Sequence, residues 1–566
     1  MPPVSPSIHS NPQRYHAPCL KLGGFFIDER APLSYRRGMQ LEHTALEHSK
    51  THASRLISAS RRLVEKRILT WTCVLLTAVA YLGNLTPGHV FSQDDFAAYV
   101  MHAENLVEGR SYTDTRYVAN PDAPWLAPAN GYPPVYPLLL APIYEFKGFN
   151  LRAFKVMTVL CFAAFLAIFA ELIGTETPQW VTLAALLIVG LNPLFWEYRE
   201  NVLSEFPYLL FTFGALLLIQ RVYPALKRDE VRLGSALLLA VLLYCAYGTR
   251  TIGIALVPAL FIADVIRFRR PSRFMLAALA VTATLMLGQA AWLTSPKGYI
   301  AAEQISGQIA MRNAIYYSKT LAYFWQNGFS KGIQITFALL FTALAAAGFL
   351  RRLWAERSAR EFYLLGYLAI LFLWIAEFGL RALLPILPLY VAYGLGEFAS
   401  ITRVLRRKTR LLAMAALIAL ICGTYAGKAW QDSRMSPEPN VDDPAAQELF
   451  AFLRAHTRES DLLVFPKPRA LALFTNRRTA SLDPGGSPEH SFQFLKSVHA
   501  DVLVEPVWSP PAYQNLLASG KVEASEVFHD SQYRVYQLEL NRAAVLAARN
   551  DAPPRASPVS PATPLE

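Results

Sequence analysis

The chain has 566 residues, of which 53% are hydrophobic and only 17% are charged. A typical soluble domain carries about 25% charged residues, so this composition argues against a soluble or a disordered protein. The net charge of +12 would favour nucleic-acid binding in a soluble protein, but the basic residues stand mostly at the ends of apolar runs, where the positive-inside bias explains them better. No nucleic-acid partner is therefore expected.

Residues 1–67 form a mostly polar stretch with basic clusters, and we expect a largely disordered cytoplasmic tail there. From residue 68 onward the chain contains long apolar runs. The run 68–85 has no charged residue, which is typical of a membrane span. We therefore expect an all-α polytopic membrane protein with about eleven transmembrane helices, at 68–86, 151–173, 180–197, 205–223, 233–249, 252–266, 274–293, 332–350, 361–379, 383–400 and 410–428.

The distribution of Lys and Arg predicts the orientation. With the N-terminus inside, the short inner loops are rich in basic residues, whereas the outer loops are longer and poorer in them. The first outer loop, 87–150, and the loop 294–331 then face outward, as does everything after the last span. We expect a multi-pass protein of the plasma (inner) membrane with a cytoplasmic N-terminus.

The region after the last span has a different composition. Residues 429–550 alternate helix-like stretches, such as 444–456, with apolar strand-like ones, such as 462–465. This alternation predicts a small extracytoplasmic α/β domain. The end of the chain, 551–566, is rich in Pro, Ala and Ser and is expected to be disordered.

The first outer loop opens with two adjacent carboxylates, Asp94 and Asp95, followed by His102 and Glu104. Adjacent carboxylates repel each other, so such a pair tends to bind a cation or to raise one pKa, and either property suits a general base. Helical spacing would place Asp95, Tyr99 and His102 on one face. The alternative is a helix N-cap, a common position for Asp.

Two further segments carry outward-facing polar groups. Residues 131–138 contain three prolines and Tyr136, and we expect a rigid turn with interfacial tyrosines. Residues 192–207 form a tight turn between two spans and carry Arg199 and Glu205. Glu205 stands at the start of a span, where it could cap the helix or line a polar site.

A last segment, 377–388, places Glu377 and Arg381 four residues apart. The two side chains could pair with each other. Alternatively, Arg381 could hold a phosphate at the outer mouth of the helix bundle, and Arg250, between two spans, is a similar candidate. Either arginine could also be a simple interfacial anchor.

Together these segments resemble the GT-C membrane glycosyltransferases, which use a polyprenyl-phosphate-linked sugar and include the protein O-mannosyltransferases and the bacterial lipid A aminoarabinose and galacturonic acid transferases. The resemblance rests on Asp94-Asp95, Gly109, the Pro-Pro-x-Tyr-Pro segment 133–137, Arg199 with Ser204-Glu205, and Arg381 with Pro385 and Pro388. The second acid of the family's pair is often Glu, whereas here it is Asp95. The resemblance covers about 94–388 and implies a GT-C-like catalytic module over 68–428.

The resemblance implies transfer of a sugar to an envelope glycan, lipid or protein, with inversion and with Asp94 as the general base. Residues expected to bind substrate are Asp95, His102, Glu104, Tyr136, Arg199, Glu205, Arg250 and Arg381. The leaving phosphate needs an arginine or a divalent metal ion, and Asp94 and Glu205 are the candidate metal ligands. The alternative is a polytopic transporter or lipid flippase, but the spans are nearly free of charge near the midplane.

Overall fold

The computed structural model describes residues 19–22, 25–28, 65, 67–83, 85–123, 128–293, 306–326, 330–374 and 377–540. The chain divides into two units, Met1–Leu69 and Thr70–Glu566. In the first unit, strands β1 (Cys19–Leu22) and β2 (Phe25–Asp28) pair antiparallel. The tail expected to be disordered thus contains a short ribbon, and most of its other residues lie outside the described ones.

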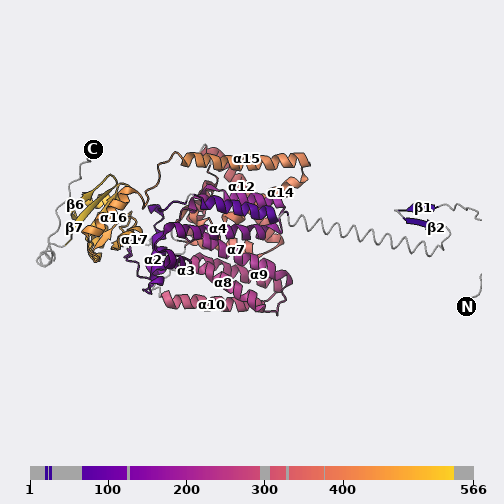
Figure 1. Cartoon of the computed structure of the whole chain (residues 1–566), viewed down its shortest axis with the longest axis horizontal. Coiled ribbons are helices and arrows are strands. Elements are labelled where there is room, and N and C mark those ends of the chain that lie inside the picture. The colour runs from indigo at the N-terminus through magenta and orange to yellow at the C-terminus, as the bar shows by residue number, and fades with distance from the viewer. Residues whose placement is uncertain are drawn as a thin grey trace, which may run out of the picture. The chain divides into compact units, whose positions relative to one another are not determined.

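Helices dominate the second unit (Figure 1), and every predicted span coincides with at least one helix. After the helix Arg67–Leu82 come α2 (Asp95–Val107), α3 (Val135–Lys147), α4 (Leu151–Gly174), α5 (Gln179–Gly190), α6 (Pro193–Tyr198), α7 (Glu205–Val222), α8 (Leu233–Thr249), α9 (Leu256–Phe268), α10 (Arg273–Leu293), α11 (Gly307–Leu321), α12 (Lys331–Ala355), α13 (Ala359–Leu373), α14 (Leu387–Ile401) and α15 (Arg407–Asp432). The protein is a multi-pass membrane protein.

The count of eleven spans is not confirmed. Among the described residues, six helices are long and apolar enough to cross a membrane: Leu151–Gly174, Glu205–Ala225, Thr251–Phe268, Arg273–Leu293, Lys331–Ala355 and Arg407–Asp432. The other five predicted spans fall on shorter helices, including α5, α13 and α14. Proline explains two of these lengths, because Pro193 opens a new helix soon after α5 ends and Pro388 stands in the first turn of α14.

Prolines also shape the segment 87–150. Pro134 is the N-cap of α3, and Pro137 lies in the first turn of that helix. Proline is tolerated at this end because the first amides of a helix have no partner within it. The expected rigid turn is therefore the start of a helix.

The C-terminal domain contains α16 (Pro444–His456), β3 (Leu462–Val464), α17 (Pro468–Thr475), β4 (Arg478–Ala480), α18 (Pro488–Val498), β5 (Val502–Pro506), α19 (Pro511–Ala518), β6 (Glu523–His529) and β7 (Tyr533–Glu539). Its mixed sheet has the order β4-β3-β5-β7-β6. Strand β3 pairs parallel with β4 and β5, whereas β7 pairs antiparallel with β5 and β6. The expected small α/β domain is confirmed in its helix and sheet content.

The segment after α2 holds this domain against the helical body. Tyr117 forms a parallel bridge with Thr479 of β4, and the Val118 amide donates to the Thr479 carbonyl at 2.8 Å. Asn120 donates to the Ser481 carbonyl at 2.9 Å. As a result α17 lies beside α2 (Figure 1), so the C-terminal domain contacts the helix that opens with Asp95.

Candidate functional site

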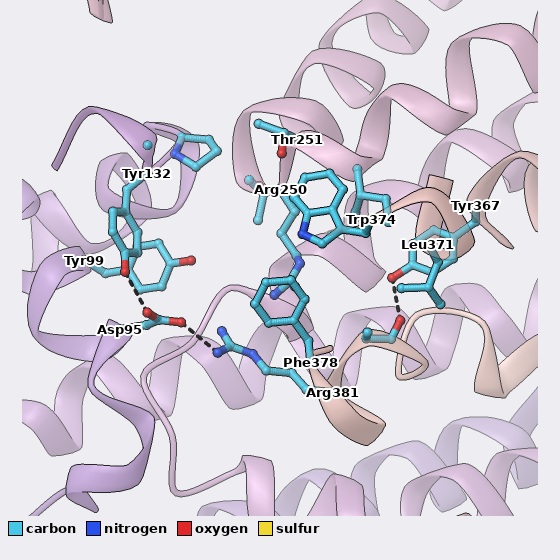
Figure 2. A pocket seen from close by; sticks show the side chains of 15 residues that line it. Asp95, Tyr99, Tyr132, Arg250, Thr251, Tyr367, Leu371, Trp374, Phe378 and Arg381 are labelled. Atoms are coloured by element: carbon cyan, nitrogen blue, oxygen red, sulfur yellow. Dashed lines mark hydrogen bonds and ion pairs between the residues drawn. The ribbon is translucent and has the colours of Figure 1, made fainter. Parts of the chain in front are cut away.

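A cavity of about 170 Å³ opens where α2, the start of α3, the α8–α9 junction and the end of α13 meet (Figure 2). Its lining is Asp95, Tyr99, Gly131, Tyr132, Pro133, Thr249, Arg250, Thr251, Ile252, Tyr367, Leu371, Trp374, Phe378, Arg381 and Ala382. One carboxylate and two arginines therefore face a cavity whose remaining wall is largely aromatic and apolar. Such a wall suits the apolar part of a ligand, and the charges suit an anionic part.

Asp95, the first residue of α2, uses both carboxylate oxygens. Its Oδ1 accepts from Tyr132 Oη at 2.6 Å and from Arg469 Nη1 at 3.0 Å, and its Oδ2 accepts from Arg381 Nη1 at 2.7 Å. Burial alone would raise the pKa of Asp95, but Arg381 and Arg469 more than offset burial and hold the pKa well below its ordinary value. The carboxylate is therefore ionised at neutral pH.

Glu205 begins α7 and is only 1% exposed. Arg250 and Arg381 both donate to its Oε1, while its buried Oε2 has no hydrogen-bond partner among the described side chains. Arg250 also donates to Ser204 Oγ at 3.4 Å, and Ser204 Oγ bonds Tyr99 Oη at 2.9 Å. A buried carboxylate between two guanidinium groups holds both arginines at the cavity.

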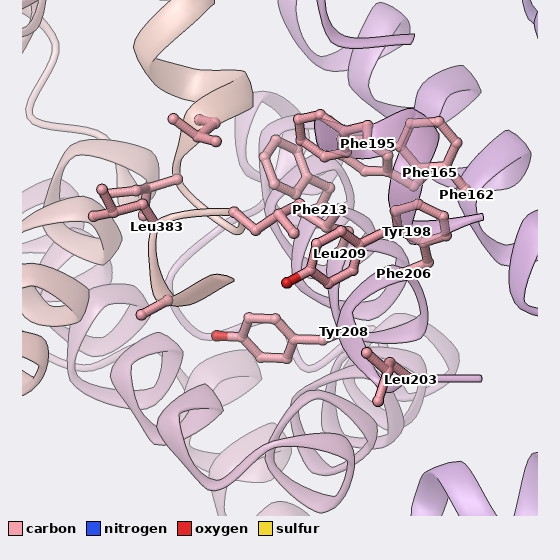
Figure 3. Close-up of a cluster of buried hydrophobic side chains, with 14 of the residues drawn as sticks. Phe162, Phe165, Phe195, Tyr198, Leu203, Phe206, Tyr208, Leu209, Phe213 and Leu383 are labelled. Atoms are coloured by element: carbon pink, nitrogen blue, oxygen red, sulfur yellow. The ribbon is translucent and has the colours of Figure 1, made fainter. Parts of the chain in front are cut away.

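Aromatic packing fixes the helix that carries Glu205 (Figure 3). Phe206 of α7 stacks on Phe162 of α4 with ring centroids 4.3 Å apart. Phe213, two turns after Phe206 in α7, meets Phe165, one turn after Phe162 in α4, edge to face with ring centroids 4.9 Å apart. Buried aromatic side chains contribute large contact areas, so the position of Glu205 is set by the core of the helical body.

Arg250 reaches the cavity because the chain turns sharply between α8 and the short 3₁₀ helix Thr251–Ala255. The Arg250 backbone is extended, at φ −147° and ψ 126°, and interrupts the helix. The turn needs Gly253, because a Cβ there would lie 2.6 Å from the backbone of Ala246. The interruption places a cation at the end of an otherwise apolar helix.

Six charged side chains form a continuous alternation of acids and arginines, which we call the acid–arginine row. Its order is Asp94, Arg469, Asp95, Arg381, Glu205 and Arg250. The three positive charges balance the three negative ones. Only Asp95, Arg381 and Arg250 line the cavity.

Asp94 has a different environment from its neighbour. It occupies the N-cap position of α2, but its side chain makes no capping bond to that helix. Instead its carboxylate accepts from the amides of Arg469 at 3.3 Å and Ala470 at 2.7 Å, in the first turn of α17. Burial raises the pKa of Asp94, opposed by Arg469 and Lys467. Asp94 thus caps a helix of the C-terminal domain and is not part of the cavity lining.

Two predicted binding residues are buried behind the cavity wall. His102 Nδ1 donates to the Tyr112 carbonyl, 2.7 Å away, and its ring stacks on Tyr112. Tyr136 bonds Thr158 at 2.9 Å, and its ring lies against Tyr99. Neither side chain lines the cavity.

Two other residues predicted to bind substrate, Glu104 and Arg199, contact side chains outside the cavity lining. Glu104 forms ion pairs with Arg110 at 3.0 Å and Arg116 at 3.8 Å. Arg199 stacks on Trp196, 3.9 Å from the ring centroid, and lies 3.3 Å from a Glu200 oxygen. The predicted residues that the structure does gather are Asp95, Glu205, Arg250 and Arg381.

The alternative in which Arg381 pairs with Glu377 is not what the structure shows. Arg381 contacts Asp95 and Glu205, and Glu377 lies 3.6 Å from Arg312. No sequence motif pointed to Arg469, the cation that joins the two aspartates. Pro468 before it marks a helix start, but no local signal connects that helix to a loop 375 residues earlier in the chain.

Among the described residues, the predicted ligands Asp94 and Glu205 do not join other acids, histidines or cysteines in a group that could hold a metal ion. Nowhere in the part of the chain that the structure describes do three His, Cys, Asp or Glu side chains gather as ligands. Of the two predicted ligands, Asp94 is bound by the amides of α17 and Glu205 by Arg250 and Arg381. Guanidinium groups already meet the charges that a metal ion would need.

No protein-family model and no curated protein matches the chain. Among solved structures, the oligosaccharyltransferase AglB of Archaeoglobus fulgidus, in complex with an inhibitory peptide and a dolichol-phosphate, aligns with 86% of this chain and 75% of its own, at 11% identity and a TM-score of 0.53. The same oligosaccharyltransferase with Zn and sulfate aligns with 82% and 73%, at 13% identity and 0.52. ArnT of Cupriavidus metallidurans in the apo state aligns with 83% and 97%, at 12% identity and 0.51.

The chain has a GT-C fold. The likeness extends over more than four fifths of the chain, and the fold expected from the sequence motifs is therefore confirmed. At 11–13% identity the likeness shows the fold alone, so activity has to be argued from the cavity and the acid–arginine row.

Proposed function

We propose that the protein is a membrane glycosyltransferase that moves a sugar from a polyprenyl-phosphate-linked donor to an acceptor hydroxyl. The observation that carries the proposal is one carboxylate, Asp95, facing the same cavity as Arg381 and Arg250 in a GT-C fold. Transfer from a lipid phosphate needs a base for the acceptor and cations for the leaving group. One solved structure of this fold contains a dolichol-phosphate, which supports a lipid-linked donor.

In the proposed reaction the acceptor oxygen attacks the anomeric carbon as the bond from that carbon to the phosphate oxygen breaks. The electron pair of the broken bond leaves with the phosphate, whose charge Arg381 and Arg250 stabilise. The acceptor proton passes to Asp95. Attack opposite to the leaving phosphate inverts the anomeric configuration.

The geometry favours Asp95 over Asp94 as the base. Asp95 lines the cavity and its side chain is 27% exposed, whereas the Asp94 side chain is 5% exposed and engaged by α17. A base must come within hydrogen-bond reach of the acceptor proton. We therefore assign Asp94 to the docking of α17, and Glu205 to the positioning of the two arginines.

Donor binding also activates Asp95 in this proposal. Arg381 donates to Asp95 Oδ2 at 2.7 Å. A phosphate that recruits Arg381 competes with that ion pair and frees Oδ2 to accept a proton. The acceptor is thereby deprotonated only when a donor is present, which limits wasteful reactions in the cavity.

The site is proposed to lie at the extracytoplasmic face, with the N-terminus in the cytoplasm and the C-terminal domain outside the plasma (inner) membrane. The basic residues of the predicted inner loops support this orientation. The acceptor is then an envelope glycan, a lipid or a protein.

Donor turnover by the purified protein tests the function. The protein in lipid nanodiscs is offered polyprenyl phosphates carrying different hexoses, pentoses or amino sugars, together with an envelope extract, and released polyprenyl phosphate is measured by mass spectrometry. We expect release with at least one donor, its loss in Asp95→Asn, and its retention in Asp114→Asn, a matched change at an exposed position of the same segment. Movement of intact donor across the bilayer without release would favour the flippase instead.

A further inference from the structure

The C-terminal domain reaches the cavity through α17. The first turn of this helix is capped by Asp94, whose carboxylate accepts a hydrogen bond from the Ala470 amide at 2.7 Å. A carboxylate at a helix N-terminus is favoured by the exposed amides and by the helix dipole. Asp94 thus joins the domain to the start of α2, one residue before Asp95.

Arg469, in the same first turn, extends from the domain to Asp95. Its side chain is 3% exposed, and its Nη1 lies 3.0 Å from Asp95 Oδ1 and 3.6 Å from Asp94 Oδ2. Its guanidinium carbon lies 5.2 Å from the ring centroids of both Tyr117 and Tyr132. Two acids and two aromatic rings therefore restrict the guanidinium to one position.

The contacts of Asp95 divide between its two oxygens. Oδ1 is held by Arg469 and by Tyr132, whereas Oδ2 is held, among the residues that the structure describes, by Arg381. Arg381 lines the cavity, but Arg469 does not. If an anionic ligand takes Arg381, Oδ2 becomes available, and Oδ1 keeps the carboxylate in its orientation.

We propose that Arg469 is a positioning residue through which the C-terminal domain completes the active site: it anchors Oδ1 of Asp95 so that Oδ2 faces the acceptor, and Asp94 holds α17 in place. This inference rests on the proposed function. It makes turnover depend on docking of a domain that stands far from Asp95 in the sequence. Arg469 acts on the substrate only through Asp95.

The variant Arg469→Met separates the anchor from the docking contact. It removes the guanidinium but keeps the backbone amides of residues 469 and 470, which donate hydrogen bonds to the Asp94 carboxylate. The domain should therefore stay docked, as judged by hydrogen exchange of α17, while kcat falls by roughly 10²-fold, the cost of misplacing a reacting group by about 1 Å. Donor affinity should not change, because Arg381 and Arg250 are intact.

Two further variants test the guanidinium itself. In Arg469→Ala, added methylguanidinium should restore part of kcat, since its planar fork can reoccupy the space between the tyrosine rings. Arg469→Lys should be weaker than wild type but better than the Met variant. The matched control is Arg454→Met in α16, an exposed arginine that donates to the Phe474 carbonyl and should leave turnover unchanged.

Wild-type kcat in Arg469→Met, with α17 docked, would overturn the proposal. So would an equal loss of donor affinity and kcat, or loss of activity that methylguanidinium does not restore in folded Arg469→Ala. These outcomes leave the proposed function intact as long as the wild-type protein consumes a lipid-linked donor. Failure of the wild type with every donor would instead reject the function itself.

Discussion

The neighbouring carboxylates Asp95 and Asp94 should respond differently to the same isosteric change. Asp95→Asn removes the proposed proton acceptor, and loss of a general base costs about 10²–10⁴ in rate. At about 1.36 kcal/mol per tenfold change, the barrier rises by roughly 2.7–5.5 kcal/mol. Donor binding should survive, because Arg381 and Arg250, the proposed phosphate contacts, are both intact and still line the cavity.

Asp94→Asn should act mainly on docking. The asparagine oxygen can keep the bond from the Ala470 amide, but the charge and the bond from the Arg469 amide are lost. Hydrogen bonds to charged groups contribute about 1.5–3 kcal/mol, so α17 should undock more readily. We expect faster hydrogen exchange of the first turn of α17 and a smaller loss of rate than in Asp95→Asn.

A single-turnover assay on donor-loaded protein in nanodiscs separates these effects. The rate of polyprenyl phosphate release reports the chemical step, and hydrogen exchange of α17 in the same samples reports docking. An equal loss of rate in Asp94→Asn and Asp95→Asn, with wild-type protection of α17, would refute the assignment of Asp95 as the base. The base would then be Asp94, as the family resemblance implies.

Four other predictions concern the acid–arginine row and the orientation. Arg381→Met should weaken donor binding by roughly 10–100-fold, the equivalent of about 1.5–3 kcal/mol, and Arg381→Lys should restore only part because it lacks the planar fork; a titration with donor checks both, and unchanged affinity would exclude a phosphate contact. Glu205→Gln removes the buried carboxylate that Arg250 and Arg381 share, although Arg381 keeps its ion pair with Asp95, so stability should fall by about 3–5 kcal/mol; an unchanged melting temperature in detergent would argue against the pairing. Burial raises the pKa of Asp95, but Arg381 and Arg469 more than offset burial and lower it. The ionised carboxylate therefore contributes stability above the ordinary Asp pKa of about 3.9, and this stability is lost as the pH falls through the lower pKa of the folded state. The pH profile of kcat/KM should show no titration of Asp95 between pH 8 and about pH 5; an acid limb in that range that moves in Asp95→Glu would contradict this expectation. A reporter fused after residue 440 should read extracytoplasmic, and a cytoplasmic signal would reverse the orientation.

The sequence was sufficient where the determining pattern is local. Apolar runs located a helix at every predicted span, and α16 begins and ends where its pattern predicts, at Pro444 and His456. The short elements α17, β4 and β6 were not predicted. Strand β4 has three residues and is defined by its neighbours, since β3 pairs on one side and Tyr117 bridges to it on the other. A strand specified by partners so distant in the chain leaves little periodicity of its own.

The pairing of Arg381 shows why sequence spacing alone could not give the site. The i, i+4 rule requires a continuous α-helix, but Gly379 has φ +61°, and residues Gly379–Ala382 form a 3₁₀ turn. That left-handed glycine breaks the helical register between Glu377 and Arg381. Arg381 instead meets Glu205 and Asp95, which lie 176 and 286 positions away in the sequence. The sequence thus identified cations and acids of the site, whereas their pairing follows from how α2, α7 and the C-terminal domain pack.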